Sequence, residues 1–432
     1  MGMLTLIGML GLEGFLFVWS VTTKKVHRKE IAIIRIGTMF LFVLLLGFGF
    51  YEWSFRYGPF LLLLVIQFLA ATRALLGMKE SFYGIGGRIG VLARNSLLYF
   101  LTLCIAIILP QYEQVATSGN LRVETEKYTW LDTSRVEGFA SSGESRALTV
   151  DFWFPDASAG TFPLVVFSHG AFGFSGSNYS TFVELASHGY VVASISHTYQ
   201  AFYTIDTQGK LTTVNPNFLQ KAIEVSSDKG EAHEEENYNT TREWMALRIG
   251  DENFVLDRIF TECKVREPEG VFSLIDTDRI GLMGHSLGGA TSAQLGRERN
   301  DIAAVIVLDG TMLGEEVGFL DNRVVLEKRP YPIPILNIYA YDHYTDAKAL
   351  VGQTYPNFFA SQNASIAYET VFHESGHLNF TDLPLFSPIL AKLLGVGRID
   401  ARYCIETMNS IVLAFFDCYL KDAKELLIEK EY

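Results

Sequence analysis

The hydrophobic residues of this chain follow two different patterns, one before residue 110 and one after it. Four long apolar runs fill the first part, and no polar face recurs in them every 3.6 residues. The runs cover residues 3–19, 31–51, 58–78 and 89–109. The last three contain 21 residues each, which as helices measure roughly 31 Å, about the thickness of the hydrocarbon core of a bilayer. Residues 1–110 are therefore expected to form an all-α transmembrane domain of four helices.

The orientation of these helices is predicted from the charges between them. The first run is the shortest and contains Glu13, but it lacks the basic start and the cleavage site of a signal peptide. Basic residues gather between runs one and two and between runs three and four: Lys24, Lys25, Arg28, Lys29, Lys79 and Arg88. The positive-inside rule puts both loops in the cytoplasm. With four spans, everything after Pro110 then faces outward, whereas an odd number of spans would reverse that prediction.

The second part alternates short β-rich stretches with helical patterns. The β-rich stretches are residues 148–154, 164–167, 190–195, 279–283, 303–308, 335–340 and 366–372. The helical patterns are residues 180–187, 242–263, 290–299 and 402–420. This alternation predicts an α/β fold with a mostly parallel sheet and helices on both faces.

Three boundaries follow from these patterns. Residues 111–145 are polar and are expected to be a linker and entry to a catalytic domain, which occupies residues 146–432. Within it, residues 204–241 are polar and include the acidic run at 234–236. The acidic run is expected to be a solvated face, and the whole stretch suits a lid insertion beside an active site.

Charge separates the two parts as clearly as hydropathy does. Residues 1–110 contain ten basic and four acidic side chains, a net charge of +6, and the remainder carries −19, giving −13 for the chain. An acidic second part argues against a nucleic-acid partner. Arg35, Arg73 and Arg94 lie inside the apolar runs, where charge is costly and often functional, although Arg35 and Arg94 are near enough to span ends to snorkel.

No metal or cofactor is expected. The four cysteines are widely spaced, with no C-x-x-C pair, and they do not decide the redox compartment. No zinc pattern and no dinucleotide fingerprint are present. The sequence does not indicate an oligomeric state.

The strongest chemical signal is the segment Gly284-His285-Ser286-Leu287-Gly288. It is a G-x-S-x-G pattern between a predicted buried strand and a predicted helix, where a strained turn exposes a nucleophilic serine. The glycines suit such a turn because neighbouring side chains would clash. Ser286 is therefore the expected nucleophile.

A second loop is expected to supply the oxyanion donors. Ser168-His169-Gly170-Ala171 follows an early strand, the usual place for a backbone donor in this architecture. We assign the donors to the N–H groups of Ala171 and Leu287. His169 is compatible with a purely structural role in the turn.

The base and the acid are expected later in the chain, in the order serine, acid, histidine. Of His343, His373 and His377, His377 is preferred because its loop follows the last predicted strand. Asp309 and Asp342 both come directly after a strand, at the edge where catalytic groups collect. General placement in α/β-hydrolases favours the later strand and hence Asp342, so the two acids remain alternatives at this point.

The sequence also resembles a known family. Residues 278–290 are similar to the nucleophile region of platelet-activating factor acetylhydrolases and bacterial lipase-like relatives. Phe167-Ser168-His169-Gly170 resembles their oxyanion segment, Leu308-Asp309-Gly310-Thr311-Met312 their acid, and Gly376-His377-Leu378-Asn379-Phe380 their histidine segment. The resemblance covers roughly residues 145–420 and implies an α/β-hydrolase fold. It also implies a triad of Ser286, Asp309 and His377, and calcium-independent hydrolysis of short or oxidised acyl esters, including phospholipid esters.

Together these observations predict a membrane-anchored, multi-pass serine ester hydrolase of phospholipase A2 or acetylhydrolase type, with an ester or lipid substrate. The membrane is contacted through residues 1–110, and the catalytic domain lies on the extracytoplasmic face. Two alternatives remain open. An acyltransferase would use the same acyl-enzyme, and an inactive hydrolase fold would act as a binding module.

Overall fold

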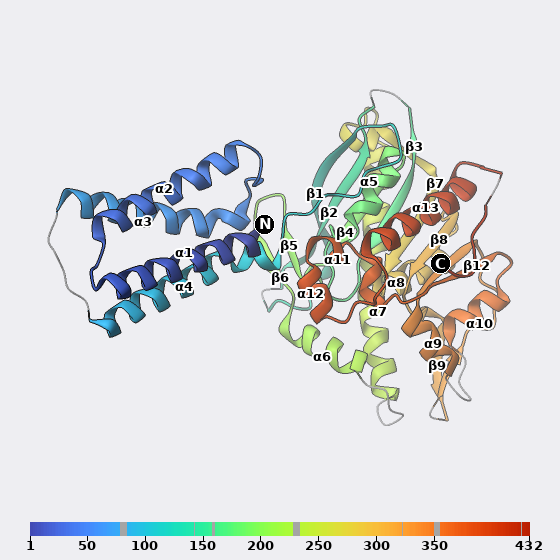
Figure 1. Ribbon diagram of the computed structural model, residues 1–432. Coiled ribbons are helices and arrows are strands. Elements are labelled where there is room, and N and C mark those ends of the chain that lie inside the picture. The colour runs from blue at the N-terminus through green and yellow to red at the C-terminus, as the bar shows by residue number, and fades with distance from the viewer. Residues whose placement is uncertain are drawn as a thin grey trace. The chain divides into compact units, whose positions relative to one another are not determined.

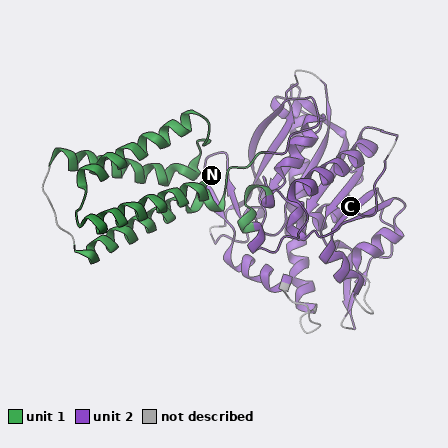
Figure 2. Cartoon of the chain, in the orientation of Figure 1, with its two compact units in different colours: residues 1–113, 385–390 green, residues 114–384, 391–432 purple. Residues whose placement is uncertain are grey.

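The computed structural model describes residues 1–77, 84–141, 143–157, 160–227, 234–321, 323–349, 355–424 and 426–432. Lys79, which contributed to the predicted orientation, and residues 228–233 of the expected lid lie outside the described residues. The chain divides into two compact units (Figure 2). Unit 1 comprises residues 1–113 and 385–390, and unit 2 comprises residues 114–384 and 391–432.

Unit 1 contains the four helices expected from the apolar runs. They are α1 (Gly2–Thr23), α2 (Arg28–Gly47), α3 (Gly58–Leu76), which continues the 3-10 turn Phe55–Tyr57, and α4 (Ile85–Ile108). All four are long and apolar enough to cross a membrane. Helix α1 packs along α4 and α2 along α3 (Figure 1).

Unit 1 has an apolar core, but unlike a water-soluble bundle it also has an apolar surface. Large apolar residues are exposed on its surface, among them Phe40, Leu41, Leu62, Leu69, Leu97 and Leu101. Polar residues are buried inside, including Glu13, Arg35 and Asn95. Such a surface would be unfavourable in water but suits a lipid environment.

Unit 2 is built on one eight-stranded sheet with the order β1-β2-β4-β3-β7-β8-β11-β12. The strands are β1 (Val123–Val136), β2 (Ser145–Pro155), β3 (Phe162–Ser168), β4 (Val191–Ser196), β7 (Ile275–His285), β8 (Ala304–Leu308), β11 (Ile335–Ala340) and β12 (Ala367–Phe372). Strand β2 pairs antiparallel with β1 and β4, and the other pairings are parallel. The expected mostly parallel α/β sheet is confirmed.

Helices cover both faces of this sheet because its central strands are apolar on both sides. On β7, Ile280 and Leu282 pack into a core shared with α7 (Glu234–Cys263) and α8 (Leu287–Glu298). Gly281 faces the other way, where a Cβ would lie 2.5 Å from the ring of Phe416 on α13 (Ala401–Leu420). Helix α5 (Tyr179–Ser187) packs beside α13 in that second layer.

Two segments contain more regular structure than their polar sequences indicated. Residues 111–145 are more than a linker, because β1 forms the edge of the main sheet and pairs with β2 from Val123 to Val136. Its side chains are mostly half-buried or exposed, so its sequence lacks the apolar run of a central strand. The insertion at 204–241 contains the hairpin of β5 (Tyr203–Ile205) and β6 (Leu211–Thr213), helix α6 (Pro216–Ser227) and the start of α7.

The remaining helices and strands are short. They are the hairpin of β9 (Glu316–Leu320) and β10 (Arg323–Leu326), and the short helices α9 (Tyr341–Ala349), α10 (Pro356–Asn363), α11 (Leu383–Phe386) and α12 (Pro388–Leu393). Short 3-10 turns lie at Gly270–Leu274, Leu313–Glu315 and His377–Phe380. The last of these turns carries the histidine expected to be the base.

Candidate active site

Ser286 occupies a strained turn between β7 and α8. Its φ and ψ are 55° and −125°, a conformation that is costly for any residue except glycine and persists at functional sites when its surroundings enforce it. The enforcement comes from the backbone: Ser286 N donates to Leu308 O at 2.9 Å, and Ala290 N donates to Ser286 O at 3.1 Å. The turn therefore fixes the serine at the N-terminus of α8.

The glycines around Ser286 are required by close backbone approaches. A Cβ on Gly288 would lie 1.9 Å from the carbonyl oxygen of Ser168, and one on Gly284 would lie 2.2 Å from the carbonyl carbon of Gly288. On the facing loop, a Cβ on Gly170 would lie 3.2 Å from the Cβ of Ser286. These contacts bring the loop Ser168–Gly173, called here the oxyanion loop, directly against the serine.

Asp309 and His377 are brought together at the same edge of the sheet. Asp309 follows β8, has a φ of 49° and is buried. Its Oδ2 lies 2.6 Å from Nδ1 of His377, and its Oδ1 accepts from the backbone N–H of Ala340 at 2.6 Å. Because Nδ1 of His377 is engaged, its Nε2 is the nitrogen free to exchange a proton. Among the described residues, no hydrogen bond joins this ring to the Ser286 hydroxyl, and such bonds are often long before substrate binds.

A second histidine, His343, also contacts Asp309. Its Nδ1 lies 2.8 Å from Asp309 Oδ2, and its ring lies 4.9 Å from the ring of His377. Burial by itself raises the pKa of Asp309, but the hydrogen bonds from His343 and His377 outweigh it and lower the pKa below its ordinary value. Asp309 is therefore ionised at neutral pH. The same contact raises the pKa of His343.

These three residues also form a group that could hold a metal ion, since their ligand atoms lie within 4.8 Å of one another. One carboxylate and two imidazoles are a donor set that zinc accepts. Here both Nδ1 atoms are already hydrogen-bonded to the carboxylate, so the arrangement is explained without an ion.

Asn379 holds the turn that carries His377. Its Oδ1 accepts from the backbone N–H groups of Gly376 at 2.9 Å and Gly397 at 2.8 Å. Asp382, two residues beyond the turn, accepts from the backbone N–H of Ser180 at 2.7 Å and ties the segment to α5. Asn379 and Asp382 therefore position the segment that carries the candidate base.

His285 also contacts the turn that carries His377. Its Nε2 lies 3.0 Å from the carbonyl oxygen of His377, and the two rings lie 4.5 Å apart. Burial lowers the pKa of His285 to about 3. It is therefore neutral and can donate a hydrogen bond without adding charge beside the candidate base.

Arg248 fixes the oxyanion loop. This fully buried side chain of α7 donates to the carbonyl oxygens of His169, through Nη1, and Gly170, through Nη2 at 3.4 Å. Its Nε donates to Gln200 at 2.7 Å. Clamping these two carbonyls fixes the peptide planes that precede Ala171, so its N–H is held in one direction. The sequence patterns did not indicate Arg248, because it lies on a helix far along the chain from the loop.

A buried polar network supports the base of the same loop. Asp251 accepts from Arg146 at 2.6 Å and lies 2.9 Å from Nδ1 of His197, whose Nε2 lies 2.8 Å from the hydroxyl of Ser168. Burial lowers the pKa of His197 to about 3. His169 is part of this support, since its Nε2 accepts from the backbone N–H of His197 at 3.3 Å, which agrees with a structural role.

The other sequence candidates lie outside this cluster. Asp342 is exposed on α9, and its Oδ1 accepts from the backbone N–H of His343 at 2.8 Å. His373 is paired with Glu431 at 2.9 Å. Leu287 is the first residue of α8, so its N–H belongs to the group of helix-terminal amides without an intrahelical acceptor. The structure thus groups Asp309 with His377 and gives Asp342 a local role.

Comparison with known proteins agrees with this geometry. A model of the family described as platelet-activating factor acetylhydrolase, isoform II, matches residues 153–428. The platelet-activating factor acetylhydrolase of Cavia porcellus is 26% identical over 270 residues, which cover 60% of this chain and 58% of that protein. The Gallus gallus protein of the same name is 28% identical over 290 residues, 60% of this chain and 62% of its own. The match therefore spans somewhat more than half of the length of these relatives.

Among solved structures, a ferulic acid esterase from Streptomyces cinnamoneus superposes with a TM-score of 0.55 at 21% identity. The match covers 73% of this chain and 95% of that one. At this identity the likeness shows the fold alone.

Proposed function

Because this chain belongs to the family of platelet-activating factor acetylhydrolase, isoform II, we propose that it is a membrane-anchored serine ester hydrolase. Its substrates are lipid or short-chain carboxylic esters, which it cleaves through an acyl-enzyme. The observation that carries this proposal is the pairing of His377 with the buried Asp309 at 2.6 Å beside the strained turn of Ser286.

In the first step, Ser286 Oγ attacks the ester carbonyl carbon while its proton passes to Nε2 of His377. The proton on Nδ1 stays in the hydrogen bond to Asp309, whose negative charge stabilises the imidazolium. The carbonyl oxygen becomes an oxyanion held by the N–H groups of Ala171 and Leu287. The C–O bond to the alcohol then breaks, and the alcohol leaves with the proton from Nε2.

Water completes the cycle by the same route. It adds to the acyl carbon while Nε2 accepts its proton, the carboxylic acid departs, and Ser286 regains its hydrogen from His377. The proposed reaction steps use no metal ion or cofactor.

An apolar cluster beside the serine supports an acyl substrate. Phe218 and Ala222 of α6 pack with Met245 of α7 and with Leu287 and Ala290 of α8. Ala171 and Trp244 lie against the same cluster, and the rings of Phe218 and Trp244 are 5.2 Å apart. Since both proposed oxyanion residues border it, we propose that the acyl chain enters here and that α6 limits its length.

The proposed membrane anchor is unit 1, and the proposed orientation puts unit 2 on the extracytoplasmic side. The support is the apolar surface of the four helices together with the basic residues between α1 and α2. Protease added to intact cells should cleave unit 2. Protection in intact cells with cleavage only after lysis would reverse the orientation.

The test of the catalytic proposal is labelling of the full-length protein with a fluorophosphonate, followed by hydrolysis of p-nitrophenyl esters of increasing chain length. Ser286→Ala should lose the label and reduce kcat by several orders of magnitude, as loss of a triad serine does elsewhere. Its melting temperature should stay close to that of the parent protein. A variant that keeps more than a few per cent of the activity would exclude Ser286 as the nucleophile.

A further inference from the structure

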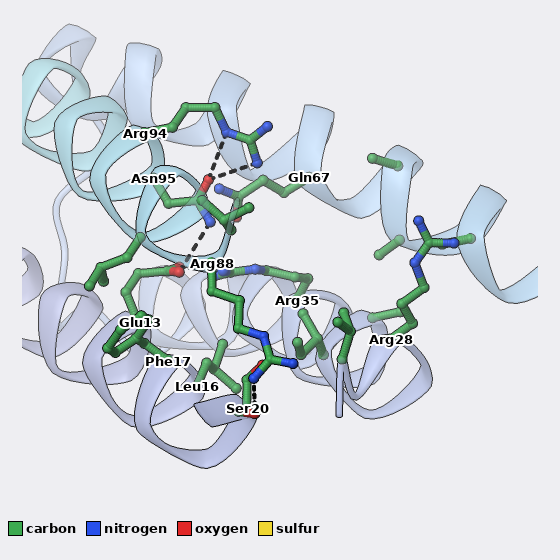
Figure 3. Close-up of a pocket in the computed structure, with 18 residues that line it drawn as sticks. Glu13, Leu16, Phe17, Ser20, Arg28, Arg35, Gln67, Arg88, Arg94 and Asn95 are labelled. Atoms are coloured by element: carbon green, nitrogen blue, oxygen red, sulfur yellow. Dashed lines mark hydrogen bonds and ion pairs between the residues drawn. The ribbon is translucent and has the colours of Figure 1, made fainter. Parts of the chain in front are cut away.

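A cavity of about 320 Å³ lies between the four helices of unit 1 (Figure 3). Every helix contributes to its lining: residues 13–20 of α1, 28–35 of α2, 67–74 of α3 and 88–95 of α4. The cavity therefore lies toward the ends where α1 and α3 finish and α2 and α4 begin. Three alanines of α3 and one of α2 line it, and their small side chains leave the space open.

The lining carries an excess of positive charge. It contains four arginines, Arg28, Arg35, Arg88 and Arg94, and one acid, Glu13. Arg88, half-buried, and Arg94, exposed, belong to a unit with an apolar surface, where a charge without a counterion is costly.

Glu13 is already committed to one of these arginines. It forms an ion pair with Arg35, and both side chains are buried. It also accepts from Asn95 at 3.1 Å, while Arg35 donates to the hydroxyl of Tyr99 at 2.7 Å. Among the described residues, Glu13 is therefore ion-paired with Arg35 and with neither Arg88 nor Arg94.

Among the described residues, Arg88 and Arg94 form hydrogen bonds to neutral groups. Arg88 donates to the backbone carbonyl of Ser20, and its buried Nε has no hydrogen-bond partner. Arg94 donates to the side-chain oxygen of Asn95 at 3.1 and 3.2 Å. Within the part of the chain that the structure describes, neither arginine forms an ion pair with a carboxylate. Figure 3 shows both bonds and the single acid among the labelled side chains.

We propose that this cavity binds the phosphate of an anionic glycerophospholipid from the cytoplasmic leaflet. A phosphate accepts several N–H bonds, and arginine is the side chain best suited to donate them. The volume is at the lower end of the range of ligand pockets, roughly 300–1,000 Å³, which fits a headgroup rather than a whole lipid. Leu16, Phe17, Val91 and Leu92 provide apolar walls for the glycerol and the first part of the acyl chains.

A lipid is favoured over a free anion because the site lies within the proposed membrane-spanning unit, at the end that carries Lys24, Lys25 and Lys29. Basic pockets between transmembrane helices on the cytoplasmic side are suited to anionic headgroups. The proposal rests on the proposed membrane insertion and orientation of unit 1, but not on the hydrolase activity of unit 2.

The experiment uses the full-length protein, first recovered from the membrane fraction and then stripped of lipid in detergent. Native mass spectrometry is used to titrate it with phosphatidylglycerol, with phosphatidylcholine, and with glycerophosphoglycerol, the headgroup without chains. Phosphatidylglycerol should bind about tenfold or more tightly than either of the other two. The double variant Arg88→Gln/Arg94→Gln should lose this preference.

Two controls separate the site from general attraction and from misfolding. Lys24→Gln/Lys25→Gln removes the same number of charges from exposed positions near the same helix ends, outside the lining, and should keep the preference. Ala71→Leu extends a lining side chain into the cavity, retains every charge and should weaken phosphatidylglycerol binding by about tenfold. If the arginine variant does not melt as a folded protein, Ala71→Leu decides the test.

Equal binding of the two lipids by the parent protein would overturn the proposal, as would full retention of the preference in both cavity variants. Binding of glycerophosphoglycerol as tight as that of the lipid would show a free-anion site and overturn the lipid as occupant. Absence of the protein from the membrane fraction would contradict the membrane insertion of unit 1, on which this proposal rests.

Discussion

Replacing Asp309 by asparagine tests the arrangement of the active site most directly. The carboxylate accepts three hydrogen bonds, from Ala340 N at 2.6 Å, His377 Nδ1 at 2.6 Å and His343 Nδ1 at 2.8 Å. An amide in the same place offers one acceptor and one donor group. If its oxygen keeps the bond to Ala340, its nitrogen faces His377 and favours the tautomer with the proton on Nε2. That tautomer cannot accept the proton of Ser286.

The expected loss of rate is therefore large. The corresponding change in a well-studied serine protease lowers kcat by about 10⁴, which corresponds to about 5.4 kcal/mol at about 1.36 kcal/mol per tenfold. The free energy of unfolding should fall by less than this, by about 1.5–3 kcal/mol, the usual range for a hydrogen bond to a charged group. Hydrolysis of p-nitrophenyl butyrate and thermal melting measure the two effects separately.

Asp342→Asn is the matched control. Asp342 is exposed, and its carboxylate accepts from the neighbouring amide of His343 at 2.8 Å. An asparagine can accept the same bond, so kcat should stay above about a tenth of the parent value. An inactive Asp342→Asn protein together with an active Asp309→Asn protein would refute the assignment of the acid.

The pH dependence of melting gives an independent check on Asp309. Its pKa is lowered in the fold by the bonds from the two histidines, against the effect of burial. Ionised Asp309 therefore stabilises the protein above its unfolded pKa of about 3.9, and this contribution is lost as the pH falls through the lower folded value. Asp309→Asn should show a smaller loss of stability on acidification than the parent protein.

Three further predictions address residues outside the proposed triad. Arg248→Gln should leave the carbonyls of His169 and Gly170 without their buried donor. We expect kcat to fall by up to about 10²-fold, less than on loss of an oxyanion donor itself. An unchanged kcat would argue against a role of Arg248 in fixing the oxyanion loop. His343→Gln should change kcat less than about tenfold. Because Asp309 raises the pKa of His343, the charge on His343 stabilises the protein below about pH 6.5, and this stabilisation is lost as the pH rises through the raised pKa. The melting temperature of the variant should therefore lack this decline with rising pH. Phe218→Ala should move the preferred p-nitrophenyl ester toward longer chains, and an unchanged chain-length profile would place the acyl chain elsewhere.

Much of the fold could be predicted because its signals are local. A membrane-spanning helix satisfies its own backbone hydrogen bonds, so a long apolar run is sufficient to predict it. Central parallel strands are buried on both faces and appear as continuous apolar stretches, such as β8 and β11. Edge strand β1 gave no such signal, because only part of its side chains are covered.

The sequence by itself determined the two-part organisation, the turn at Ser286 and the histidine turn at His377, since each depends on a few neighbouring residues. Local patterns did not separate Asp309 from Asp342, and the family resemblance favoured Asp309; only the tertiary structure shows its carboxylate 2.6 Å from Nδ1 of His377. Both aspartates follow a strand, and no local pattern shows that Asp309 is buried whereas Asp342 is exposed. The same holds for Arg248, His343 and the arginine cavity of unit 1. Their contacts join residues 34 to 79 positions apart in the chain. Examples are the bonds of Arg248 to His169, His343 to Asp309 and Arg88 to Ser20. Such contacts form when distant segments pack together, so no local pattern predicts them.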